Sequence, residues 1–199
     1  MKKLLLTGIV FSALSVGIST VHATTGCNSI GWTEPHGMTG CQLYYPAVSW
    51  MYKQGIASGE GQAGKFNPQR TVNRAEFLKL ALLTADVEIT ACSVSPFPDV
   101  PKTAWFAPYI CTAKEKGFIG GFPDGTFKPA QDVRFSEGAK IVATIFGIKT
   151  NPADATYYDQ TGFWYRPYTR ALLGKKAVPE TINSFAKQLT RGEMGEMLY

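Results

Sequence analysis

The chain has 199 residues, of which 45% are hydrophobic and 18% are charged, with a formal net charge of +5. This length and balance predict one domain, or a few small units that share a core, and they exclude a disordered tail and a large multidomain protein. The 20 glycines, 12 prolines and 13% aromatic residues predict short elements joined by many turns rather than a long coiled coil.

Residues 1–23 have the pattern of a secretory signal peptide. Two lysines precede an apolar run at residues 4–18, and Val21-His22-Ala23 fits the small-residue pattern of a cleavage site. The run is shorter than the roughly 20 residues that span a bilayer, which disfavours the alternative of an uncleaved anchor. We therefore expect an exported mature chain that begins near Thr24, has no membrane span and carries a net charge of +3.

The four cysteines Cys27, Cys41, Cys92 and Cys111 lie in the exported part, where an oxidising compartment favours disulfides. Of the three connectivities we favour Cys27 with Cys41 and Cys92 with Cys111, because each pair closes a short loop beside the start of a repeat. The spacings contain no C-x-x-C pair, which disfavours a zinc site, so no metal or cofactor is expected. Lipid modification of Cys27 is a further alternative, but no leucine stands in the three residues before it.

A repeated pattern runs through the mature chain. Residues 46–76 and 108–137 share a proline, a glycine nine residues later, a second glycine, the F-x-P triplet and a glutamate that opens a helix. A third, worn copy begins at Trp164, where W-Y-R-P-Y corresponds to W-F-A-P-Y at Trp105. Glu76, Glu137 and Glu193 are spaced 61 and 56 residues apart. The sequence therefore predicts three small stacked modules.

Each module is predicted to form a helix, a turn, an extended loop and a second helix. The first helix is expected to begin after Pro46, Pro108 or Pro167, because proline is tolerated in the first turn. Gly55 or Gly117 is expected to end it by adopting a left-handed conformation.

The second helix of each module is predicted to begin with a capping box. Asn73 with Glu76, and Thr190 with Glu193, pair a cap side chain with a glutamate three residues later, and Glu137 stands at the same place in the second module. Losing such a cap costs about 1 kcal/mol. The arginine in the shared Asn/Thr-Arg-x-Glu pattern has no part in the cap and opposes the helix dipole, which makes it a candidate functional residue.

At these residues the chain resembles the S-layer homology (SLH) domain family. The second module has F-P-D-V at 97–100, Trp105, G-F-I-G-G at 117–121 and D-G-T-F-K-P at 124–129; the first has G-I at 55–56, F-N-P at 66–68 and R-A-E at 74–76; the third has Trp164, Phe185 and T-R-G-E at 190–193. The match divides the mature chain into a disulfide-bearing N-terminal segment (24–43) and SLH repeats at 44–90, 91–150 and 151–199. The last repeat is degenerate and has a short final helix.

The resemblance implies a mainly α fold, in which three helix-loop-helix SLH repeats form a pseudo-threefold arrangement around a central three-helix bundle. The bundle is expected to bury Phe77, Leu80, Ile141, Ile145, Met194 and Leu198. The resemblance also implies a non-catalytic, secreted module that attaches proteins to the bacterial cell envelope or cell surface. Grooves between repeats of this family bind anionic or pyruvylated cell-wall polysaccharide, or glycan linked to peptidoglycan.

The chain also departs from the family pattern. Phe135 occupies the arginine position of the second repeat, and Arg134 stands one residue too early. The third repeat lacks the D-G turn, and the first lacks the F-x-D-V entrance. These differences predict unequal grooves, with those of Arg74 and Arg191 active and the one beside Phe135 weak, unless Phe135 is itself packed in the core.

The candidate residues for glycan contact are Arg74, Arg191, Trp105, Trp164, Arg134 and Asp99. A guanidinium suits a carboxylate, pyruvate ketal or phosphate, because its paired donors match two acceptor oxygens. An indole face can stack on the apolar side of a sugar, although both tryptophans could instead be core residues. Surface ion pairs are the alternative for the arginines, and capping of the following turn is the alternative for Asp99.

No enzymatic activity is expected. The mature chain has one histidine, His36, so it has no two-histidine metal site, and a Ser-His or Cys-His arrangement would have to use that residue. Glu76, Glu137 and Glu193 already have capping roles, which disfavours a carboxylate pair for glycoside hydrolysis. A wall-active hydrolase and a structural or protein-binding envelope module are the alternatives. The mild positive charge lacks dense basic clusters, which predicts no nucleic-acid partner.

Overall fold

The structure is a computed structural model that describes residues 41–58, 66–151 and 162–199. The predicted signal peptide, Cys27 and the side chain of Cys41 lie outside the described part. Within it the chain forms no strand and six helices, which confirms the mainly α fold class. They are α1 (Cys41–Lys53), α2 (Arg74–Thr84), α3 (Ala107–Glu115), α4 (Phe135–Ile145), α6 (Arg166–Gly174) and α7 (Arg191–Leu198).

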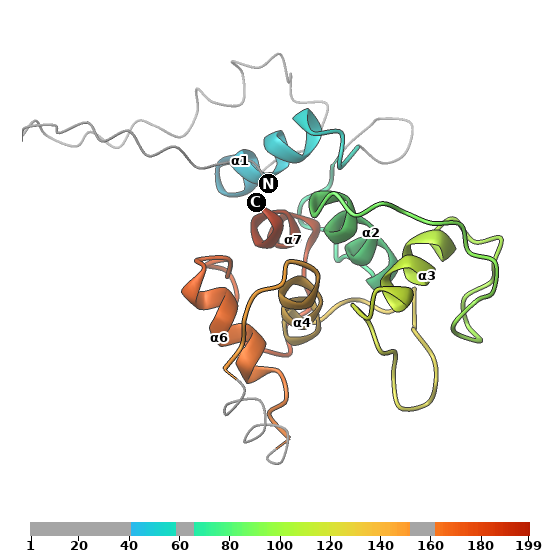
Figure 1. Cartoon of the computed structure of the whole chain (residues 1–199). Coiled ribbons are helices and arrows are strands. Elements are labelled where there is room, and N and C mark those ends of the chain that lie inside the picture. The colour runs from blue at the N-terminus through green and yellow to red at the C-terminus, as the bar shows by residue number, and fades with distance from the viewer. Residues whose placement is uncertain (1–40, 59–65, 152–161) are drawn as a thin grey trace, which may run out of the picture.

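The helices form an inner and an outer group. The inner helices α2, α4 and α7 lie in the middle of the molecule, with α1, α3 and α6 around them (Figure 1). Each outer helix packs on the inner helix of a different repeat: α1 on α7, α3 on α2 and α6 on α4. A single repeat is therefore not an independently packed unit, because its outer helix completes the core of its neighbour.

The three inner helices begin where the capping pattern predicts. Asn73 Oδ1 accepts a hydrogen bond from the Glu76 amide at 2.9 Å, and the Glu76 carboxylate accepts one from the Asn73 amide at 3.2 Å. Thr190 and Glu193 make the same reciprocal pair at α7. The α4 helix has half of this box, because an arginine side chain cannot accept a hydrogen bond. Only the Glu137 carboxylate contributes there, at 3.0 Å from the amide of Arg134.

The predicted start of the first helix is right in two repeats and wrong in one. Pro108 and Pro167 lie in the first turns of α3 and α6. By contrast, α1 begins at Cys41, so Pro46 lies inside that helix. A proline removes one intrahelical hydrogen bond, but it does not prevent the preceding residues from forming a turn of helix when other contacts stabilise them.

The turns after the outer helices use a left-handed residue in all three repeats. Gly55 and Gly117 have φ angles of +69° and +73°, as the sequence predicts. The third repeat has Lys176 at this place, with a φ of +58°. The turn is therefore kept where the glycine is lost, at some conformational cost for a residue with a side chain.

A closed ring of backbone hydrogen bonds joins the three repeats beside the inner helices. The Val72 amide donates to Leu189, the Leu189 amide to Val133 and the Val133 amide to Val72, at 2.8–3.0 Å. All three side chains are fully buried. The ring connects the three repeats in cyclic order.

The first amides of the inner helices, which have no partner inside a helix, donate to a loop of a neighbouring repeat. The amides of Arg74, Phe135 and Arg191 donate to the carbonyls of Gln131, Lys187 and Arg70, respectively, at 2.8–2.9 Å. The next amide of each helix donates to the same loop, two residues upstream. These helix N-termini are thus occupied, so an anion would have to be bound by side chains.

The inner helices α2 and α4 approach each other closely at Gly138 of α4. A Cβ atom at this position would lie 2.7 Å from Leu189 Cδ1 and 3.1 Å from Phe77 Cζ. The bundle residues that the sequence predicts as core are all buried: Phe77, Leu80, Ile141, Ile145, Met194 and Leu198.

Cys92 and Cys111 form a disulfide, with their Cα atoms 5.5 Å apart. It ties the segment before α3 to that helix and confirms one of the two predicted pairs. The other pair falls on Cys27 and the side chain of Cys41, outside the described part. Among the described residues, no helix combines the length and the apolar character needed to cross a membrane.

Candidate functional site

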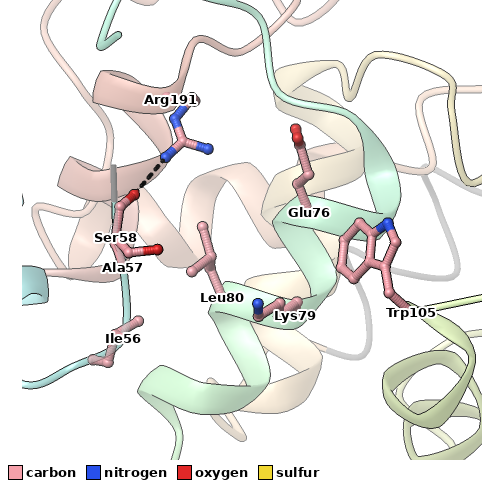
Figure 2. A pocket seen from close by; sticks show the side chains of 8 residues that line it. All are labelled: Ile56, Ala57, Ser58, Glu76, Lys79, Leu80, Trp105 and Arg191. Carbon is pink, nitrogen blue, oxygen red and sulfur yellow. Dashed lines mark hydrogen bonds between the residues drawn. The ribbon is translucent and has the colours of Figure 1, made fainter. Parts of the chain in front are cut away.

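A groove of about 220 Å³, here called groove 1, lies where the three repeats meet. Its lining residues are Ile56, Ala57, Ser58, Glu76, Lys79, Leu80, Trp105 and Arg191. Figure 2 shows Glu76, Lys79 and Leu80 projecting from α2, between Arg191 on one side and Trp105 on the other. Groove 1 therefore combines an arginine of the third repeat, a lysine of the first and an indole of the second.

A second groove of about 390 Å³, here called groove 2, repeats this layout one module further along the chain. It is lined by Arg74, Phe118, Ile119, Gly120, Gly121, Phe122, Pro123, Glu137, Lys140, Ile141 and Trp164. The arginine, glutamate, lysine and tryptophan of groove 2 stand at the repeat positions of their counterparts in groove 1. The molecule thus has two related sites, each built across repeat boundaries.

Arg74 and Arg191 are buried side chains that each fasten a neighbouring loop. Arg74 Nε donates to the carbonyl of Phe127, and Arg191 Nε donates to that of Phe66, both at 2.9 Å. Each guanidinium also lies over the ring of the same phenylalanine, 4.8 and 4.5 Å from the centroid. The two arginines are 7% and 5% exposed, so they are not the surface charges of the alternative interpretation.

The environment of Arg74 keeps it charged at the wall of groove 2. Burial lowers the pKa of its guanidinium, while the carboxylates of Glu137 and Asp99 oppose that shift. The nearer of these, Glu137 Oε1, lies 3.9 Å from Arg74 Nη1. An arginine remains protonated in proteins, so groove 2 presents a fixed positive charge.

Each groove also contains a lysine that the sequence interpretation missed. Lys79 Nζ lies 5.5 Å from the ring centroid of Trp105 and 5.7 Å from that of Tyr109. Lys140 Nζ is similarly placed, 5.4 Å from the centroid of Trp164. The recurrence of a lysine six residues after the helix cap in two repeats is the signal that could have found them. Groove 1 and groove 2 thus each pair two cations with one indole.

The two predicted tryptophans lie at the grooves and not in the core. Trp105 is 54% exposed and Trp164 is 37% exposed. Each packs edge-on against the residue that follows it, with interplanar angles of 81° and 85°. This contact fixes the orientation of each indole while much of its surface stays open to a ligand.

The remaining two candidates lie outside both grooves. The Asp99 carboxylate accepts hydrogen bonds from the amides of Phe127 and Lys128, at 2.9 and 2.7 Å, and so holds the F-K-P loop rather than the following turn. Arg134 is the exposed N-cap residue of α4. The structure therefore brings four of the six candidates into the grooves and leaves Asp99 and Arg134 among the residues that shape or flank them.

The third interface differs from the other two in chemistry. Phe135 is 2% exposed and stacks on Phe185, with centroids 6.4 Å apart and an interplanar angle of 17°. It is thus packed in the core, and its ring replaces the guanidinium that covers the F-x-P phenylalanine in the other repeats. The repeat position of the groove lysines is taken by Glu196, whose pKa is raised to about 6 by burial and by the nearby carboxylates of Glu193 and Glu180.

The carboxylates at the grooves are committed to structural bonds. Glu76 accepts from the Asn73 amide and forms an ion pair with Arg70 at 2.9 Å. Glu137 accepts from the Arg134 amide. Among the described residues, no group of three or more His, Cys, Asp or Glu side chains could hold a metal ion. What the grooves can offer a ligand is positive charge, hydrogen-bond donors and an aromatic face.

Comparison with known proteins gives the family. The family model of the S-layer homology domain matches residues 42–78 and 96–137. Cell surface glycoprotein 1 of Acetivibrio thermocellus is 42% identical over 81 residues, which are 40% of this chain and 4% of that protein. The Middle cell wall protein of Brevibacillus brevis is 30% identical over 150 residues, which are 72% of this chain and 13% of that protein. The S-layer protein sap of Bacillus anthracis is 29% identical over 106 residues, which are 53% and 13% of the two chains.

The chain therefore corresponds to a small part of these much longer relatives. The matched segments contain the inner helix caps of the first two repeats and the tryptophan of groove 1, as the sequence pattern predicts. Through residues 42–78 and 96–137, the chain belongs to the S-layer homology domain family.

Proposed function

We propose that this cell-envelope attachment module is non-catalytic and binds an anionic or pyruvylated cell-wall polysaccharide, or glycan linked to peptidoglycan, in grooves 1 and 2. Its place at the cell envelope follows from the family and from the S-layer relatives. The observation that supports the choice of ligand is the duplicated set of an arginine, a lysine and an exposed tryptophan.

The chemistry of this set suits an acidic sugar. A carboxylate or pyruvate ketal placed between the lysine ammonium and the guanidinium would accept charge-assisted hydrogen bonds, each worth about 1.5–3 kcal/mol. The indole face would cover the apolar C–H side of the sugar ring. Because two such grooves lie on one module, a polymer with repeated acidic residues can engage both and gain avidity.

Two other functions are weaker explanations of the same geometry. A hydrolase would need an acid and a base free to act on a glycosidic bond, whereas the carboxylates of Glu76 and Glu137 serve as helix caps. A purely structural or protein-binding module would leave the duplicated lysine and tryptophan without a role. The changed third interface is the one feature that favours drifted grooves.

The lysines give the sharpest test, because the arginines also hold the fold together. Lys79→Gln and Lys140→Gln, made singly and together, should each weaken co-sedimentation with protein-free sacculi by about tenfold or more. Lys116→Gln is the matched control, since this lysine is exposed at the end of α3 and lines neither groove. Circular dichroism checks that every variant is folded. Parent-like binding by the double variant, or an equal loss in the control, would contradict the proposal.

Further experiments distinguish the wall anchor from the hydrolase and from the protein-binding module. Trp105→Ala and Trp164→Ala should weaken binding without loss of fold, because both indoles are partly exposed at the grooves and lie outside the core. Incubation of the parent with sacculi should release no soluble glycan fragments, and release would support the hydrolase. Binding only to envelope preparations that retain their proteins would support the protein-binding module.

A further inference from the structure

A third cavity, here called the apolar pocket, lies beside α6 and the loop that precedes α7. It measures about 260 Å³, and its lining includes Phe135, Leu173, Val178, Ile182, Asn183 and Phe185. Leu173 is 67% exposed and Phe185 is 41% exposed. The pocket therefore presents an open, mainly apolar surface, unlike grooves 1 and 2.

The apolar pocket owes its character to one replacement in the repeat. At the first position of the inner helix, Arg74 and Arg191 place a guanidinium over the phenylalanine of the facing loop. Phe135 places a ring there instead, parallel to that of Phe185. The change removes this buried guanidinium and its donors from the wall and leaves two stacked rings, of which Phe135 is buried and Phe185 is partly exposed. A ligand in this pocket therefore meets no buried arginine equivalent to Arg74 or Arg191.

An unbroken series of rings connects the apolar pocket with groove 2. Trp164 lies 5.7 Å from Tyr165, Tyr165 lies 4.8 Å from Phe185, and Phe185 lies 6.4 Å from Phe135, measured between centroids. The first ring belongs to groove 2 and the last two belong to the apolar pocket. Ring contacts thus link the two sites.

Polar groups stand at the edge of the apolar pocket. Asn183 and Ser184 are exposed lining residues whose amide and hydroxyl can both donate and accept hydrogen bonds. Arg170 also lines the edge and already has an interaction within the chain. An apolar floor of rings, with the Asn183 amide, the Ser184 hydroxyl and the Arg170 guanidinium at its rim, matches a ligand that has one C–H face and several hydroxyls.

We propose that the apolar pocket binds an uncharged sugar residue, with the C–H face of the sugar on Phe185 and its hydroxyls toward Asn183 and Ser184. This site is separate from the anion-binding grooves and differs from them in ligand class. The series of rings from Trp164 makes it a neighbouring subsite for a glycan that also enters groove 2. The neutral site itself does not require that groove 2 be occupied.

Nuclear magnetic resonance of the full chain tests this site with uncharged probes. Titration with chitotetraose and with cellotetraose should shift the resonances of Phe185, Ile182 and Asn183 with at least one of the two sugars. Phe185→Ala should weaken that binding by about fivefold or more. Phe146→Ala is the matched control, because its ring is 39% exposed and lies outside the pocket lining. Both probes lack an anionic group, so their binding is measured independently of the co-sedimentation with sacculi that tests the proposed wall anchor.

Several results would overturn the inference. If neither sugar shifts the resonances of the pocket residues, the pocket does not bind an uncharged sugar. Parent-like binding by Phe185→Ala would place any bound sugar elsewhere. Shifts at the pocket with 1-octanol but with neither sugar would identify a purely apolar docking site. Tighter binding of glucuronate than of glucose at the same resonances would show that Arg170 selects an anion there.

Discussion

Arg74→Ala tests whether the buried arginines join the repeats. The change removes the donor that holds the Phe127 carbonyl, and an unsatisfied buried acceptor costs about 1–3 kcal/mol. It also removes a cation from the rings of Phe122 and Phe127, at 4.6 and 4.8 Å, where such contacts are worth about 0.5–2 kcal/mol. The ion pair with Glu137 is long, at 3.9 Å, and adds little. The expected loss in the free energy of unfolding is about 2–4 kcal/mol.

Urea unfolding, followed by both circular dichroism and tryptophan fluorescence, measures this loss and checks that the transition is two-state. Arg74→Lys should lie between the parent and Arg74→Ala, because it keeps the charge but lacks the planar Nε donor. Arg134→Ala is the control, since Arg134 is exposed at the start of α4, and it should change stability by less than about 0.5 kcal/mol. A cost for Arg74→Ala no larger than that of the control would refute the structural role of the arginine.

Three further changes test the packing, the charge and the disulfide. Gly138→Ala should lower the free energy of unfolding in urea by about 1–3 kcal/mol, because the added methyl would lie 2.7 Å from the nearest side-chain atom. Gly174→Ala is the control, and it should be neutral or stabilising because there is open space around Gly174. Equal effects of the two changes would contradict the tight contact at Gly138. The pKa of Glu196 is raised to about 6, so its protonated form is favoured in the fold and stability is lost as the pH rises from the ordinary value of 4.5 to about 6. Glu196→Gln should therefore raise the melting temperature at neutral pH and leave it unchanged in acid, and an effect that is independent of pH would contradict the assignment. Replacing Cys92 and Cys111 by serine should cost about 3 kcal/mol, measured by thermal unfolding, and insensitivity of the parent to reduction would count against this bond.

The parts of the fold that rest on local chemistry could be predicted from the sequence. A capping box needs only Asn73 and Glu76 three residues apart, and the left-handed turn needs only Gly55 or Gly117 after a helix. The central bundle was implied by the family resemblance, and its core consists of apolar residues of the second helix in each repeat. The start of α1 could not be found this way, because Pro46 lies inside the helix and the buried Tyr44 before it packs against Gly192 of another repeat.

The parts that rest on contacts between repeats could not be predicted. The partner of Arg74 is a carbonyl 53 residues away, and Asp99 binds amides 28 and 29 residues away. In the sequence, the arginine has no role in its own helix, which suggested that it contacts a ligand. The structure shows that Arg74 holds a loop of another repeat. The placement of each outer helix on the inner helix of a different repeat likewise has no signal in the repeat pattern itself.

The groove residues fall between these cases. Trp105 and Trp164 were found because the W-x-x-P pattern recurs, although the sequence could not distinguish a core ring from an exposed one. Lys79 and Lys140 recur at the same position and were passed over, since a lysine on a helix is ordinarily a solvated charge. Only the structure places each lysine beside an indole and across from an arginine.

The most direct test of the wall-anchor proposal compares one set of sacculi before and after selective removal of its acidic polymer. The parent chain should co-sediment with the untreated, protein-free sacculi and should lose that binding by about tenfold or more once the acidic groups are gone. Rising salt should weaken the binding to untreated sacculi, because exposed charges are screened. Equal binding to both preparations would contradict the account, since grooves lined by arginine and lysine would then have no anionic ligand on the wall.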